Sequence, residues 1–319
     1  MAGRIRIGIS GWTYRPWRGR FYPKGLPRTR ELAYAAARFA SIEINGTFYG
    51  LQRPESFAAW SEQVPPGFVF AVKGSRYITH MLRLRDVETP LANFLASGLL
   101  RLGPHLGPIL WQFPARMRFD PARFQRFLAL LPHDTEAALT LARRHDARVA
   151  GRTWLAVNRR RPLRHAVEVR HASFRNPAFI RLLRRNKVAL VCADSVDWPR
   201  LMDVTADFVY CRLHGSEELY ASGYDDDALD AWTARVRAWG AGGEPDDAQR
   251  VAGPARPRKA GRDIYVYFDN DAKVRAPVDA ASLAARLDGL PDRPSPVSKP
   301  AMPGRDPRID APRPADYTG

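Results

Sequence analysis

Short runs of hydrophobic residues recur along the chain in an order that predicts a series of strands. Within each run the apolar side chains either alternate with polar ones or follow one another without a break, as they do in strands of a parallel sheet. The eight runs are residues 5–11, 42–48, 68–73, 108–113, 166–171, 188–195, 208–214 and 264–270.

Helical patterns occupy most of the intervals between these runs. Residues 31–39 place several apolar side chains on one face at helical spacing. Asp120 and Asn176 each stand before a proline, which is typical of an N-cap followed by the first helical position. The interval 197–207 is the weakest, because it is short and contains Pro199. Alternating strands and helices predict an α/β fold, and eight units predict a closed (β/α)8 TIM-type barrel.

The barrel pattern covers residues 4–290 and predicts a single domain. Residues 291–319 contain eight prolines and few apolar positions. Such a segment cannot bury enough apolar surface to offset its ordering entropy, so it is expected to be a disordered Pro/Arg-rich tail. Residues 240–262, rich in Gly, Pro and charge, are expected to form a mobile loop.

One face of the predicted strands is unusually polar. Side chains alternate along a strand, so the polar residues opposite Ile42 and Ile44, or opposite Cys211 and Leu213, should point into the barrel. The inward set predicted by this alternation is Ser10, Trp12, Glu43, Asn45, Thr47, Lys73, Gln112, Glu168, Arg170, Asp194, Tyr210, Arg212, His214, Tyr265, Tyr267 and Asp269.

These polar residues lie toward the C-terminal ends of the strands, where the active sites of such barrels form. Burying an unpaired charge costs roughly several kcal/mol per ion. A cluster of such charges therefore indicates a functional site rather than a contribution to stability. The alternative is a self-satisfied salt-bridge network, for example Glu168 with Arg170 or Arg212. Among the site candidates, Glu43, Glu168 and His214 are predicted to be catalytic, the carboxylates as general acid and base. Lys73, Arg170 and Arg212 would hold an anion.

The composition indicates which classes of binding partner can be expected. The 319 residues carry a net charge of +17, but the arginines are scattered and no nucleic-acid motif accompanies them. Weak, non-specific nucleic-acid binding is therefore the expectation. No stretch approaches the roughly 20 apolar residues of a membrane span, and no signal-peptide pattern is seen, so a cytoplasmic protein is expected.

The two cysteines, Cys192 and Cys211, are expected to be buried thiols. No dinucleotide fingerprint or phosphate loop indicates a cofactor. A metal-dependent variant stays open, because separate strands offer four possible ligands: Glu43, Glu168, Asp194 and His214.

Several motifs occur together along the chain. They are Gly8-Ile-Ser-Gly-Trp-Thr-Tyr14, Trp17-Arg-Gly-Arg-Phe-Tyr-Pro23, Ile42-Glu-Ile-Asn-Gly-Thr-Phe-Tyr49, Phe70-Ala-Val-Lys73, Ile78-Thr-His80, Leu110-Trp-Gln-Phe-Pro114, Val167-Glu-Val-Arg-His171, Arg212-Leu-His-Gly215 and Val266-Tyr-Phe-Asp-Asn270. In this combination the chain resembles the YecE-like family, formerly catalogued as domain of unknown function 72, over residues 4–290. The resemblance implies a TIM-type barrel and supplies no reaction, substrate or cofactor.

The resemblance also adds site candidates. Its motifs carry over the signature positions Glu43, Asn45, Lys73, His80, Gln112, Glu168, Arg170, His171, Arg212 and His214. Asp269 and Asn270, at the end of the last strand, are further site candidates. Those outside the catalytic candidates are expected to bind substrate. The leading hypothesis is an enzyme acting on a small anionic or polyhydroxylated substrate. A nucleic-acid-associated protein and a non-catalytic ligand-binding barrel are the alternatives, so whether the chain is an enzyme stays open.

Overall fold

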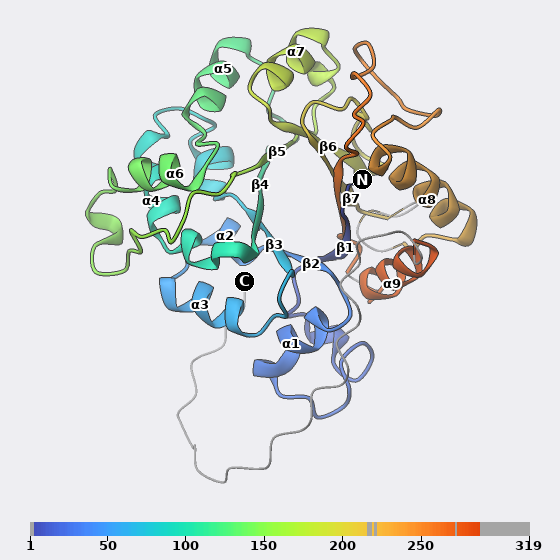
Figure 1. The fold of residues 1–319 in the computed structure, drawn as a ribbon, viewed down its shortest axis with the longest axis horizontal. Helices are drawn as coiled ribbons and strands as arrows, with labels where there is room; N and C mark the ends of the chain where they lie inside the picture. Colours follow the sequence, from blue (N-terminus) through green and yellow to red (C-terminus); the bar gives the residue numbers. More distant parts are fainter. Residues whose placement is uncertain (1–2, 216–218, 220–221, 272, 288–319) are drawn as a thin grey trace.

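Eight parallel strands close into a barrel in sequence order (Figure 1). The computed structural model describes residues 3–215, 219, 222–271 and 273–287. The strands are β1 (Ile5–Ser10), β2 (Ser41–Ile44), β3 (Val69–Lys73), β4 (Leu106–Gln112), β5 (His165–Glu168), β6 (Ala189–Asp194), β7 (Phe208–Leu213) and β8 (Asp263–Phe268). Since β1 pairs with both β2 and β8, no strand edge is left open. The predicted fold and the order of all eight strands are confirmed.

Helices cover the outside of the barrel (Figure 1). The α-helices are α1 (Glu31–Ala36), α2 (Gly46–Tyr49), α3 (Pro54–Glu62), α4 (Glu88–Ala96), α5 (Pro121–Leu130), α6 (Thr135–Ala142), α7 (Pro177–Arg185), α8 (Asp226–Gly240) and α9 (Ala276–Arg286). Shorter helical turns are η1 (Arg15–Trp17), η2 (Arg28–Arg30), η3 (Tyr77–Met81), η4 (Leu99–His105), η5 (Ala147–Val149) and η6 (Ala172–Phe174). Among the described helices, none combines the length and apolar character that a bilayer crossing requires.

The predicted helix starts follow from side-chain caps. Asp120 accepts a hydrogen bond from the main-chain N–H of Arg123 and begins α5, and Asn176 accepts one from Ala178 and begins α7. The weak interval also behaves as predicted, because residues 195–207 contain no helix.

The strand side chains form two layers. The outer layer belongs to the large core beneath the helices and includes Ile9, Ile42 and Val266. The inner layer combines small residues with a group of three tyrosines. Tyr210 and Tyr267 are fully buried, their ring centroids lie 5.1 Å apart, and Tyr265 stacks against Tyr210 at 6.4 Å. We call Tyr210, Tyr265 and Tyr267 the tyrosine floor, since the polar residues of the barrel mouth lie beyond it.

The second strand is shorter than predicted. It ends at Ile44, and the chain turns into helical conformation at Asn45 (φ −86°, ψ −24°), which begins α2. Thr47 therefore lies in α2 rather than on the strand, where its hydroxyl donates to the carbonyl of Lys73 at 2.7 Å. The prediction that Asn45 and Thr47 line the inner face of this strand was wrong.

Two further inward predictions are also wrong. Asp194 lies on the outer face of β6, where it accepts hydrogen bonds from the Tyr224 hydroxyl and the Trp232 indole. Both faces of β6 are largely apolar, so alternation alone does not distinguish them. Trp12 lies beyond the end of β1 and packs edge-on against Trp60 of α3, with ring centroids 5.6 Å apart.

The segment between α8 and β8 has no regular structure, yet it is held in place by several hydrogen bonds. The buried carboxylate of Asp203 accepts from the main chain of Val251 and Ala252, each at 2.9 Å. Arg262 donates to the carbonyls of Gly243 and Arg256. These contacts were not anticipated by the prediction of a mobile loop. The predicted disordered tail, residues 291–319, lies outside the described residues.

Candidate functional site

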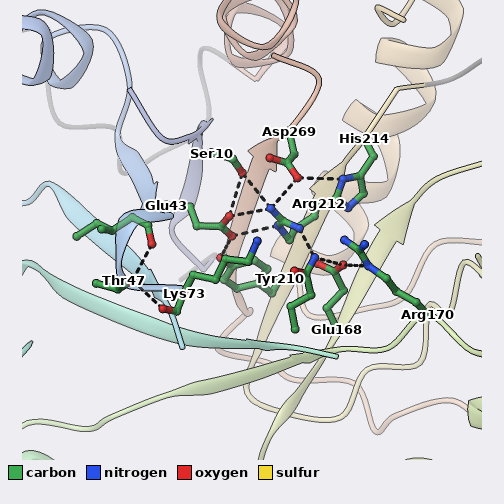
Figure 2. A network of polar contacts seen from close by, with 12 residues as sticks. Ser10, Glu43, Thr47, Lys73, Glu168, Arg170, Tyr210, Arg212, His214 and Asp269 are labelled. Atoms are coloured by element: carbon green, nitrogen blue, oxygen red, sulfur yellow. Dashed lines mark hydrogen bonds and ion pairs between the residues drawn. The ribbon is translucent and has the colours of Figure 1, made fainter. Parts of the chain in front are cut away.

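Arg212 is at the centre of a buried polar network at the C-terminal ends of the strands (Figure 2). Its guanidinium donates to Glu43 Oε1 at 2.9 Å, to Glu168 Oε2 at 2.7 Å and to Asp269 Oδ2 at 2.8 Å. A longer contact reaches Ser10 Oγ at 3.4 Å. Arg212 on β7 thus joins carboxylates from β2, β5 and the end of β8, and the structure brings these four sequence-predicted residues together.

The two glutamates are held from several sides. Glu43 also accepts from the hydroxyls of Ser10 and Tyr210. Glu168 accepts from Gln112 Nε2 at 2.9 Å and from Arg170 Nε at 2.8 Å. The side chains of both glutamates have 0% exposed surface. Gln112 is therefore confirmed as an inward residue at the mouth, and its contact is with Glu168.

The charges of this network reinforce one another. Burial alone would raise the pKa of Glu168, but Arg212 and then Arg170 outweigh it and hold that pKa well below its usual range. Burial would also raise the pKa of Asp269, but Arg212 and then His214 outweigh it and lower that pKa. Burial would lower the pKa of Arg212, whereas the surrounding carboxylates raise it well above its ordinary value. Both carboxylates and the guanidinium are therefore ionised at neutral pH.

Lys73 differs from Arg212 in its surroundings. It is 8% exposed at the end of β3, and among the described residues no carboxylate oxygen lies within ion-pairing distance of Nζ. Its ammonium lies 4.5 Å from the centroid of the Phe48 ring. Burial and then the charge of Arg212 lower the pKa of Lys73. Figure 2 shows this side chain directed toward Glu43 and Glu168.

Arg170 and His80 lie on the solvent side of the network. Arg170, just beyond β5, stacks on Trp198 with its guanidinium carbon 4.0 Å from the ring centroid, and it is 16% exposed. His80 lies in the π-helical turn η3, where its Nδ1 contacts the Thr79 hydroxyl at 2.8 Å. Partial burial, followed by Arg170 and Lys73, lowers the pKa of His80 to about 4. His80 is therefore a neutral imidazole at physiological pH.

His214 is fully buried just beyond β7. Its Nδ1 lies 3.1 Å from Asp269 Oδ2, and its ring packs edge-on against Trp198 at 5.3 Å. A carboxylate beside an imidazole nitrogen fixes the ring orientation and its tautomer. The structure therefore connects the predicted catalytic histidine to the network through Asp269.

Three further predicted substrate-binding residues lie at the ends of elements. Asn45 precedes α2 without capping it through its side chain, and its Oδ1 is buried with no hydrogen-bond partner among the described residues. His171 caps η6 by accepting from the main-chain N–H of Ser173 at 3.1 Å. Asn270 is fully buried and donates to Asp279 Oδ2 at 2.8 Å, which links the end of β8 to α9.

Asp271 is a candidate that the alternation pattern missed. It lies two residues beyond Asp269, past the end of β8, where no strand periodicity applies. Partial burial and the negative charge of Asp269 raise the pKa of Asp271 to about 6. The only sequence signal was its place directly after the Asp269-Asn270 motif.

The four residues that the sequence offers as possible metal ligands do not all lie together. Asp194 lies on the outer face of β6, whereas Glu43 and Glu168 are held by Arg212 inside the barrel. Within the described ranges, no three His, Cys, Asp or Glu side chains are arranged so that they could hold a metal ion.

Comparison with known proteins places this barrel in a family. A family model described as "Protein of unknown function DUF72" matches residues 6–303. The chain belongs to the DUF72 family. Among curated relatives, the UPF0759 protein YecE of Escherichia coli (strain K12) is 31% identical over 111 residues. That match covers 35% of this chain and 38% of the relative, so the chain matches well under half of that relative's length.

Solved DUF72 structures share the fold. A DUF72 family protein from Thermotoga maritima MSB8 aligns with a TM-score of 0.65 and 22% identity, covering 89% of this chain and 99% of that one. A DUF72 family protein from Enterococcus faecalis V583 aligns with a TM-score of 0.62 and 16% identity, covering 90% and 97%. At these identities the likeness concerns the fold alone, and it confirms the closed barrel.

Proposed function

We propose that this DUF72 barrel is an enzyme that binds a small anionic, hydroxyl-bearing substrate at the barrel mouth and acts on it by carboxylate acid–base chemistry. The observation that carries the proposal is Lys73, a nearly buried ammonium without a carboxylate partner among the described residues. A buried cation is costly unless it is paired, so a bound anion is the partner that completes this site. Arg170, the partly exposed cation beside it, supplies a second contact.

Arg212 has a different role in this proposal. Its donors are directed at Glu43, Glu168 and Asp269, and its side chain has no exposed surface. It therefore holds the carboxylates in place instead of meeting the ligand. The salt-bridge alternative to a site thus describes Arg212 well. It describes Lys73 less well, because Asp269, Glu43 and Glu168 favour its charge only from beyond ion-pairing distance, and burial and Arg212 outweigh them.

The acid–base role belongs to residues that a substrate can reach. Glu43 and Glu168 have no exposed surface, whereas Asp269 is 12% exposed and Asp271 is half-buried. Asp269 stays ionised, and the pKa of Asp271 is raised to about 6. Two neighbouring carboxyl groups with pKa values shifted in opposite directions are the usual arrangement of a base and an acid. We therefore assign Asp269 as the base and Asp271 as the acid, with Glu43, Glu168 and His214 positioning them.

Binding is tested by thermal unfolding in the presence of inorganic phosphate, glucose 6-phosphate and citrate. At least one of these anions should stabilise the parent, and the Lys73→Met variant should lose that shift. Lys24→Met, which removes an exposed lysine, is the matched control and should keep it. No shift in the parent with any anion, or an equal shift in Lys73→Met, would contradict the anion site.

Catalysis is tested separately from binding. Compounds that stabilise the parent are incubated with it and followed by NMR for chemical change. Asp271→Asn should still bind them and should convert them at least about 100-fold more slowly, in the range usual for loss of a general acid. If the parent binds these compounds through Lys73 but converts none of them chemically, the result would support the non-catalytic ligand-binding barrel instead.

A further inference from the structure

A concave, positively charged site lies at the opposite end of the barrel from Lys73. It is a pocket of about 1010 Å³, formed where the chain enters the later strands. Arg164 immediately precedes β5, Asp207 precedes β7 and Arg262 precedes β8. In a parallel barrel all strand starts are at one end, so this pocket is separate from the mouth. Its cationic lining residues are Arg164, Arg184, Lys187, Arg256, Arg258 and Arg262.

The pocket has a large excess of positive charge. Against these six cations the lining contains one carboxylate, Asp207, which is paired with Arg164 at 3.1 Å. Arg164 also pairs with Asp263, outside the lining, at 2.6 Å, so the excess charge comes from the other five cations. The side chains of Lys187, Arg256 and Arg258 make no ion pair or hydrogen bond with any described residue. Like charges gathered in a concave surface focus a positive potential, which attracts anions.

Part of this lining is fixed in advance. Arg184 on α7 donates to the carbonyls of Val204 and Gly253, the second at 2.8 Å. Arg262 is buried and donates to main-chain carbonyls of the segment that follows α8. Figure 1 shows this segment in orange between α8 and β8. Pro254 and Pro257 restrict its backbone further, so a ligand has to order the exposed side chains of Arg256 and Arg258 but little of the main chain that carries them.

The chemistry of the lining selects among anions. It contains no Phe, Tyr or Trp, and its one aromatic side chain is the imidazole of His133, so the pocket offers a nucleic-acid base a single small ring to stack on. Its volume is at the upper end of the range for small-molecule sites, about 300–1,000 Å³, and far exceeds a single phosphate. Arginine binds phosphate oxygens in pairs, and several arginines in a row suit several phosphates.

We propose that this pocket binds a short linear chain of phosphates, of the size of inorganic tripolyphosphate. Arg256, Arg258 and Lys187 contact the phosphate oxygens directly, and Arg164, Arg184 and Arg262 form the fixed base of the site. This site does not depend on the activity proposed for the mouth.

Calorimetric titration of the full chain with tripolyphosphate tests the proposal. The parent should bind, and the double variant Arg256→Ala/Arg258→Ala should bind about tenfold or more weakly, which corresponds to about 1.4 kcal/mol. The double variant Arg181→Ala/Arg185→Ala removes two exposed arginines from α7 that do not line the pocket. Its affinity for tripolyphosphate should stay within about twofold of the parent's affinity, well below the tenfold change that corresponds to about 1.4 kcal/mol. Lys73→Met should also bind like the parent, which separates this site from the mouth.

Three outcomes would overturn the proposal. They are the absence of tripolyphosphate binding, an equal loss in both double variants, and binding of orthophosphate as tightly as tripolyphosphate. The second outcome would mean that net charge alone attracts the anion. Competition with a single-stranded oligonucleotide supplies a further arm. One result would be that the oligonucleotide displaces tripolyphosphate at a phosphate concentration lower than that of the tripolyphosphate, and another that its own binding is lost in Arg256→Ala/Arg258→Ala. Those two results together would mean that the ligand class is nucleic acid and that the proposal is wrong.

Discussion

At the scale of single residues, Arg212 shows how one side chain fixes the geometry of a site without being free to bind a ligand. Its planar guanidinium presents five N–H donors in fixed directions. The carboxylates of Glu43, Glu168 and Asp269 occupy those directions. A lysine at this position has a single charged nitrogen on a flexible stem and cannot bridge three carboxylates in the same way.

We expect Arg212→Ala to destabilise the fold by about 3–5 kcal/mol, because it leaves buried carboxylates without their counter-charge. Equilibrium unfolding in urea measures the loss. Arg148→Ala is the control, since Arg148 is 66% exposed and its contacts with Asp146 and the Tyr77 hydroxyl lie at the surface, so its removal should change stability far less. A loss for Arg212→Ala as small as that of the control would contradict the network.

The raised pKa of Asp271 predicts a pH dependence with a definite sign. Its pKa is about 6 in the folded protein, against an ordinary value of 3.8, so the folded state binds this proton more tightly than the unfolded chain. The parent therefore loses stability through this group as the pH rises from about 4 to about 6. Asp271→Asn lacks the titration, so it should gain about 1–2 kcal/mol relative to the parent over that interval, after allowance for partial solvent screening.

Urea unfolding at a series of pH values checks this difference. The exposed Asp197 serves as the control, and the curve for Asp197→Asn should run parallel to that of the parent. If the Asp271→Asn curve were also parallel to the parent curve, the shifted pKa would be refuted.

The residues of the site were predictable only where the alternation was clear. On β7 and β8 one face is apolar and the other polar, which was enough to place Arg212 and Asp269 inside. On β6 both faces are apolar, and Asp194 was misplaced. The partners of Arg212 come from strands far apart in the sequence, so no local pattern could pair them. Asp271 lies past its strand, where period-two reasoning ends.

At the scale of elements, the predictions succeeded where a local signal sets the boundary. The capping hydrogen bonds of Asp120 and Asn176 define the starts of α5 and α7. The predictions failed where a tertiary contact sets the boundary of an element. An example is Thr47, whose hydroxyl donates to the carbonyl of Lys73 at the end of β3. The backbone after η3 was also unforeseen: Arg83, Leu84 and Asp86 all adopt positive φ. Such strained residues and π-turns are frequent at functional sites, and these follow His80.

The anchoring of the segment after α8 gives a prediction for Asp203. Removing its carboxylate frees the N–H groups of Val251 and Ala252 and should release the segment. We expect trypsin to cut Asp203→Ala after Arg250, Arg258 or Lys259 about tenfold faster than it cuts the parent, since about 1.4 kcal/mol of local stability is lost. Fragment masses identify the cuts.

Asp246→Ala, which changes an exposed residue of the same segment, is the control and should be cut like the parent. Equally fast cutting of the parent at these sites would show that the hydrogen bonds do not hold the segment and would favour the mobile loop expected from composition.

At the scale of the whole molecule, repetition made the fold predictable. Eight strand signals separated by helical intervals leave few alternatives to a closed parallel barrel. The net charge of +17 was less informative, because a total says nothing of where the charges gather. The pocket containing Arg256 and Arg258 depends on how the segment after α8 folds back beneath the strands, which composition does not reveal.

The fold should not depend on a metal ion. The barrel is closed by strand pairing on all sides and packed on both faces by apolar residues, which accounts for its closure without a metal. We expect protein purified without added metal to contain less than about 0.1 equivalent of any transition metal, and its Tm to be unchanged by EDTA. Elemental analysis that finds one tightly held ion, lost on substitution of Glu168 or His214, would replace this expectation with a metal-assisted mechanism.

The tyrosine floor has a consequence for how molecules reach the mouth. Tyr210 and Tyr267 have no exposed surface, and the hydroxyl of Tyr267 is fixed 2.6 Å from Ser41 Oγ, so the barrel is a cup and not a tunnel. Whatever reaches Lys73 must leave by the opening through which it arrived. If the mouth acts as proposed, product leaves by the same opening through which the next substrate enters, so the two molecules cannot pass at the same time.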